Sequence, residues 1–145
     1  MGGGPGIHEN LYMIVVDTSV WIDYFNGTHT PQSNTLDRLL GQEPLAIGDL
    51  ILTEILQGFR SDGDYRTAKS LLTSLSIFDM LGQENAIRSA EHYRLLRKRG
   101  ITVRKTADVI IATFCIAENH TLLFSDRDFF PFVSELGLQE VEAGT

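Results

Sequence analysis

Short apolar runs alternate with longer helical patterns along this chain. The runs predict five strands, at Met13–Val16, Leu45–Gly48, Ser76–Met80, Thr121–Phe124 and Gln139–Val141. Apolar residues recurring every three or four positions predict helices at Ser19–Phe25, Pro31–Gly41, Asp49–Phe59, Asp64–Leu75, Gln83–Arg99, Thr106–Glu118 and Phe129–Leu136. Strands that alternate with helices predict a three-layer α/β/α domain with a mainly parallel five-stranded sheet.

Two of the predicted strands are followed by acidic residues. Asp17 follows the first strand, and Asp126 follows the fourth, with Asp128 two residues later. Open α/β sheets bind ligands at the carboxyl ends of their strands, so we expect Asp17 and Asp126 to face one another. The alternatives are that Asp17 caps a helix, as Thr18 and Ser19 also can, and that Asp126 and Asp128 only form a turn.

Two further acids lie on apolar faces of predicted helices. Glu54 interrupts one apolar stripe, and Asp108 shares a helix face with Ile111 and Cys115. Glu54 alone could extend to solvent and Asp108 alone could cap its helix. No Lys or Arg lies at matching positions on those faces, and an uncompensated buried carboxylate is costly. Together the four acids predict a divalent-cation site, and an all-oxygen ligand set selects Mg²⁺ or Mn²⁺.

Magnesium held by carboxylates commonly acts on phosphodiesters, where it activates water and stabilises charge on the leaving oxygen. The predicted ligands are Asp17, Glu54, Asp108 and Asp126. Of these, Glu54 or Asp126 would help to orient the attacking water.

The charge distribution adds a second group of residues. The chain has 19 acidic and 12 basic residues and a net charge of −7. Half of the basic residues lie in one segment that contains no acid, and they are Arg94, Arg97, Lys98, Arg99, Arg104 and Lys105. This segment is either a solvated helix end, where cations suit the helix dipole, or a phosphate-binding patch that holds a phosphate backbone beside the metal bound at Asp108.

Other kinds of site are disfavoured. The four histidines show no zinc-ligand spacing, and no nucleophile elbow or P-loop occurs. The single cysteine, Cys115, lies on an apolar helix face and indicates core. No apolar run approaches the roughly 18 residues of a membrane span, so we expect a cytoplasmic protein without a membrane partner.

The chain of 145 residues is long enough for one domain with its own core. Residues 1–12 are rich in glycine and precede a second methionine, Met13, which predicts an expression leader followed by a single domain over residues 13–145.

Four segments, taken in order and spacing, resemble the PIN-domain ribonucleases, specifically the VapC-type toxins of bacterial toxin–antitoxin pairs. They are Val16–Ile22, Thr53–Gly58, Ala107–Ala112 and Ser125–Phe129, within a resemblance that covers Met13 to Val141. The resemblance implies a sheet ordered 3-2-1-4-5 and a magnesium-dependent endoribonuclease. It also implies a small antitoxin whose C-terminal tail enters the acidic groove, and commonly a homodimer.

The resemblance also assigns roles. The acidic quartet of the family falls on Asp17, Glu54, Asp108 and Asp126, and Asp128 falls on a secondary acidic position. The hydroxyl beside the first acid falls on Thr18 or Ser19, and the one before the fourth falls on Ser125.

Two other functions remain open. One is a PIN-type module that binds RNA or protein without catalysis. The other is a receiver-like phosphoacceptor domain, which needs an aspartate after the third strand and a lysine after the fifth. Asp79 lies within the third predicted strand and no lysine follows Lys105, so the sequence fits this second alternative poorly.

Overall fold

The computed structural model describes residues 13–143 and contains a five-stranded parallel sheet in the order β3-β2-β1-β4-β5. The strands are β1 (Ile14–Val16), β2 (Leu45–Gly48), β3 (Ser76–Phe78), β4 (Thr121–Leu123) and β5 (Gln139–Glu140). The helices are α1 (Thr18–Phe25), α2 (Pro31–Leu39), α3 (Asp49–Leu56), α4 (Asp62–Leu72), α5 (Gln83–Lys98), α6 (Thr106–Glu118), the 3₁₀ turn η2 (Arg127–Phe129) and α7 (Phe130–Leu136). The leader predicted at residues 1–12 lies outside the described residues.

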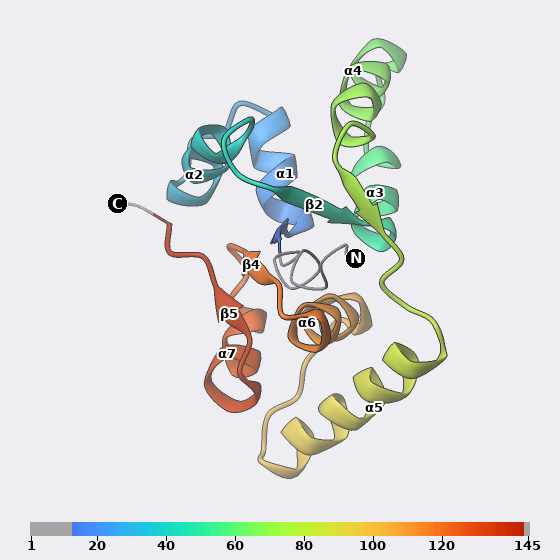
Figure 1. The fold of residues 1–145 in the computed structure, drawn as a ribbon, viewed down its shortest axis with the longest axis vertical. Coiled ribbons are helices and arrows are strands. Elements are labelled where there is room, and N and C mark those ends of the chain that lie inside the picture. The colour runs from blue at the N-terminus through green and yellow to red at the C-terminus, as the bar shows by residue number, and fades with distance from the viewer. Residues whose placement is uncertain (1–12, 144–145) are drawn as a thin grey trace, which may run out of the picture.

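Helices cover both sides of this sheet. Helices α1 to α4 lie on one side, and α5, α6 and α7 lie on the other (Figure 1). This arrangement confirms the predicted three-layer fold and the strand order. It also argues against the receiver-like alternative, because receiver domains order their strands 2-1-3-4-5.

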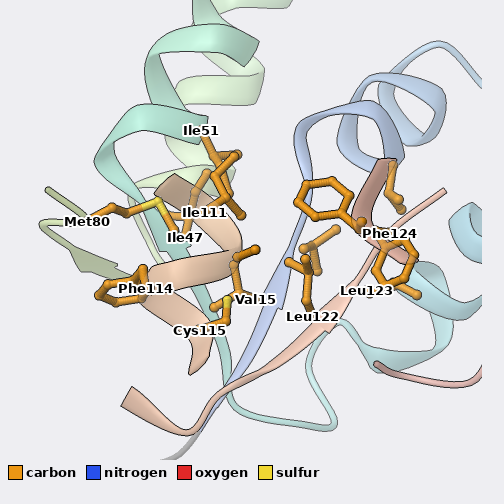
Figure 2. Close-up of a cluster of buried hydrophobic side chains, with 14 of the residues drawn as sticks. Val15, Ile47, Ile51, Met80, Ile111, Phe114, Cys115, Leu122, Leu123 and Phe124 are labelled. Carbon is orange, nitrogen blue, oxygen red and sulfur yellow. The ribbon is translucent and has the colours of Figure 1, made fainter. Parts of the chain in front are cut away.

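The central strand β1 lies between β2 and β4, with Ile14 aligned to Leu45 on one side and to Thr121 on the other. Val15 and Val16 are fully buried because both faces of the strand are covered. Figure 2 shows Val15 with Ile111 and Cys115 on one side of β1. Each such side chain contributes about 1.5–3 kcal/mol on burial, so the strand that precedes Asp17 is rigidly held.

Several element ends differ from the prediction. Helix α1 begins at Thr18, one residue early, because Asp17 already occupies the N-cap position. Helix α4 ends at Leu72 rather than Leu75. Strand β3 ends at Phe78, so Asp79 follows this strand and does not lie within it. Within the described part of the chain, no helix combines the length and apolar character needed to cross a membrane.

Gly48, the last residue of β2, makes room for a buried methionine. A Cβ at this position would clash with the Sδ atom of Met80, whose side chain is fully buried. We therefore expect Gly48→Ala to lower the free energy of unfolding by about 1–3 kcal/mol through overpacking. The midpoint of urea unfolding measures this loss. The control is Gly63→Ala, where the nearest atom is 3.6 Å away and stability should be unchanged or slightly higher. Equal stability of the two variants would contradict the packing argument.

Candidate metal centre

Acidic side chains gather at the edge of the sheet where β1 and β4 end. These strands are neighbours, with Val16 aligned to Leu123, and the Asp17 backbone N–H donates to the Leu123 carbonyl at 2.9 Å. The two chain segments that carry Asp17 and Asp126 therefore leave the sheet side by side. Helix α6 begins at the same place and carries Asp108 in its first turn.

Three carboxylates form the tightest group. Asp108, Asp126 and Asp128 each offer an oxygen that lies within 4.8 Å of the others. Asp108 is only 7% exposed, and its Oδ2 atom is buried without a hydrogen-bond partner. A buried carboxylate oxygen without a partner is costly, and a cation at this point would satisfy it. An all-oxygen group of this kind suits a hard divalent cation.

Asp17 and Glu54 belong to the same edge but not to that group of three. Asp17 is 4% exposed, and the Ser19 hydroxyl donates to its Oδ2 atom at 3.1 Å. The Thr18 hydroxyl donates to Glu54 Oε1 at 2.7 Å, which fixes the α3 carboxylate against the start of α1. Both hydroxyls singled out beside the first acid thus hold a predicted ligand.

The structure also tests the simpler explanations for these acids. Asp17 sits at the N-cap of α1 but makes no capping hydrogen bond through its side chain. Asp108 is not a cap, because Lys105 occupies that position in α6. Asp126 does cap η2, since its Oδ1 atom accepts from the Asp128 backbone N–H at 2.9 Å. Its Oδ2 atom is left for another role.

Basic side chains partly compensate the cluster, which the helix-face positions did not predict. Lys105 Nζ lies 3.5 Å from Asp126 Oδ2, and Arg104 Nη2 lies 3.3 Å from Asp128 Oδ2. Both basic side chains are more than half exposed, so these ion pairs are weak and easily exchanged.

Burial and mutual repulsion shift the protonation of the two most buried acids. Burial raises the pKa of Asp108 to about 7, and the negative charges of Asp17, Asp126 and Asp128 add to the shift while Lys105 opposes it. Burial likewise raises the pKa of Asp17 to about 6, against hydrogen bonds from Thr18 and Ser19 that lower it and with a small further rise from the charge of Glu54. The site therefore resists carrying all of its negative charges when no cation is bound.

The remaining predicted residues are dispersed. Arg94 and Arg97 line a groove between α5 and α6, together with Arg104. Arg99 pairs with Glu135 at 2.8 Å and so faces α7, and Lys98 is exposed. Ser125 is exposed beside Asp126. The basic segment is thus not one patch, because a helix end and the following loop point its side chains in different directions.

Comparisons with known proteins identify related sequences and folds. Residues 14–135 match the PIN domain family. The chain is 32% identical over 119 residues to ribonuclease VapC11 of Mycobacterium tuberculosis, covering 81% of this chain and 89% of that protein. Its fold is similar to that in VapBC2 of Rickettsia felis bound to a promoter DNA fragment, with a TM-score of 0.69, 21% identity and coverage of 88% and 96%. It is also similar to a chain of a toxin–antitoxin complex from Klebsiella pneumoniae, with a TM-score of 0.63, 20% identity and coverage of 90% and 98%.

Proposed function

Because this chain belongs to the PIN-domain family, we propose that it is an endoribonuclease that requires a divalent cation and acts as the toxin of a toxin–antitoxin pair. The observation that carries the proposal is the convergence of Asp108, Asp126 and Asp128 within 4.8 Å, beside Asp17. The proposed cation is Mg²⁺, with Mn²⁺ as a substitute.

Asp108 and Asp126 are the central proposed ligands. Among the described residues the Oδ2 atom of Asp108 has no hydrogen-bond partner and the Oδ2 atom of Asp126 pairs with the exposed Lys105, so both can accept a cation. Asp17, which follows β1, and Glu54, which Thr18 holds, complete the proposed set of ligands. Asp128 is a supporting acid. The bound cation would supply activation of water and stabilisation of charge on the leaving oxygen of the phosphodiester.

The protein's own residues would then orient the reactants. Either Glu54, held by Thr18, or Asp126 orients the attacking water. Arg104 and Lys105 lie at the mouth of the site, and their exposed side chains can exchange the acids for RNA phosphates. Ser125, next to Asp126, is a further proposed contact at this mouth.

Cleavage of single-stranded RNA with and without a cation tests this function. We expect cleavage in Mg²⁺ and none in EDTA, with recovery when Mg²⁺ or Mn²⁺ is restored. Equal cleavage in EDTA would contradict the proposal. RNA binding that survives EDTA without any strand cleavage in Mg²⁺ would instead support the non-catalytic module.

The proposed partners follow from the relatives. A toxin of this kind would be inhibited by an antitoxin, and the acidic edge suits a basic side chain on the antitoxin's C-terminal tail. We also propose a homodimer, since Ile77 and Ile87 on β3 and α5 are 43% and 51% exposed. RNA as substrate implies action in the cytoplasm. A neighbouring reading frame that encodes a short protein with a DNA-binding N-terminus would support the pairing.

A further inference from the structure

A groove between α5 and α6 lies near the proposed metal site. Its cavity measures about 590 Å³, within the roughly 300–1,000 Å³ range of small-ligand sites. Val103, Val109 and Ile110 contribute apolar surface from the loop and α6, and Ala90 and Tyr93 contribute it from α5. Ala90 is exposed at this groove. A flat apolar group is therefore a suitable occupant.

The charge of the groove is opposite to that of the chain. Three arginines, Arg94, Arg97 and Arg104, line it, and no acidic residue does, although the chain has 19 acids. Arg97 also lies 5.5 Å from the centre of the Tyr93 ring, which presents a guanidinium and an aromatic face together. The occupant should therefore carry negative charge as well as an apolar face.

One polar group in the groove has no partner. Ser89 is one of the residues that line the cavity and is only 6% exposed, and its buried Oγ atom has no hydrogen-bond partner among the described residues. A buried hydroxyl without a partner costs about 1–3 kcal/mol, which a ligand that bonds to it would recover. Ser89 thus indicates a ligand with a hydrogen-bonding edge.

The groove lies near the proposed metal site. Arg104 lines the groove and reaches Asp128 at 3.3 Å, and Thr106 and Val109, which also line it, flank Asp108 in α6. An occupant of the groove would therefore share Arg104 with the acidic group.

From these four observations we propose that the groove binds one nucleotide of the RNA strand next to the scissile bond, and that Ser89 helps to select its base. The base lies on the apolar surface beside Tyr93, its edge bonds to Ser89, and the flanking phosphates contact Arg94, Arg97 and Arg104. This inference rests on the proposed ribonuclease function and adds a specificity pocket to it. Stacking and charge together are the usual means of holding single strands.

Fluorescence anisotropy in EDTA measures the binding of short single-stranded RNAs of randomised sequence. This measurement tests the groove without relying on cleavage. Ala90→Trp would fill the groove, and we expect it to weaken binding by about 10- to 100-fold. Ala117→Trp, an exposed alanine near the end of α6, is the matched control and should bind like the unaltered chain. Arg94→Gln should weaken binding of all sequences alike and reduce the slope of log affinity against log salt concentration by about 0.7, the value for one phosphate contact on a single strand.

Base selection is read from the ends of RNAs cleaved in Mg²⁺. Ser89→Ala should relax the preference at one position beside the cut while leaving the salt dependence unchanged. If the unaltered chain cleaves and Ala90→Trp binds and cleaves like Ala117→Trp, this inference is wrong and the ribonuclease function stands. If Ala90→Trp weakens RNA binding but the unaltered chain cleaves nothing, the ribonuclease function fails and the groove stands only as a nucleotide-binding site. A variant Ala90→Trp that keeps RNA binding but loses self-association or inhibition by a protein would show a protein occupant and overturn the proposal.

Discussion

Replacing Asp108 with asparagine should abolish cation-dependent RNA cleavage and, at the same time, stabilise the metal-free protein. Cleavage should fall by about 10³-fold or more, because several kcal/mol of cation binding and charge stabilisation depend on this carboxylate. Stability without metal should rise by about 1–3 kcal/mol, because the amide removes a buried charge whose pKa is raised to about 7 by burial and by its acidic neighbours.

The two effects have opposite signs, which separates this account from simple misfolding. Cleavage rates in Mg²⁺ and urea unfolding in EDTA measure them on the same preparation. Asp79→Asn is the matched control, because Asp79 is exposed at the end of β3, away from the acidic group. A variant Asp108→Asn that loses both activity and stability would show that Asp108 serves the fold rather than a cation.

The stability of the metal-free protein should fall as the pH rises from about 5 to 8, and Mg²⁺ should reverse this trend. Asp108 and Asp17 titrate near 7 and 6 in the folded chain but near 3.8 in the unfolded chain. Between these values the folded state binds more protons, so the stabilisation by protonation is complete below about 3.8 and is lost as the pH passes through 6 to 7. A bound cation needs the ionised carboxylates, so its stabilising effect grows with pH.

Two histidines have the opposite effect on the pH dependence of stability, so their contribution must be removed from the comparison. Burial lowers the pKa of His92 and of His120, so the folded state binds fewer protons than the unfolded chain near pH 6 and these groups favour stability at higher pH. Both are present in Asp108→Asn, so the difference in melting temperature between the two proteins in EDTA isolates the carboxylate. That difference should widen as the pH rises. A difference independent of pH would show that Asp108 is not protonated on folding.

Much of the fold was predictable because burial on both faces makes parallel strands into apolar runs. Met13–Val16 and Leu45–Gly48 predicted β1 and β2 closely for this reason. The helix ends were less accurate, as at α4, because the last turn depends on tertiary contacts that periodicity does not record. The strand order came from the family resemblance, since alternation of elements alone does not determine it.

Some features of the site were likewise predictable from the sequence and others were not. An acid such as Asp108 on an apolar helix face was conspicuous in the sequence, because burying a charge needs a compensating group. The closeness of Asp108 to Asp128 could not be predicted from the sequence, because it depends on the short turn η2, which brings the Asp128 side chain beside Asp126. Ser89 gave no signal at all, because a serine between helical residues is unremarkable until its hydroxyl is found buried without a partner.

Diffraction from crystals grown with Mn²⁺ tests the central claim most directly, because the anomalous signal locates the ion independently of any activity. The account predicts a peak within coordinating distance of Asp108 and Asp126, with Lys105 moved away from Asp126. Absence of a peak at this edge of the sheet with the site saturated in Mn²⁺, and with the Lys105–Asp126 pair intact, would contradict it.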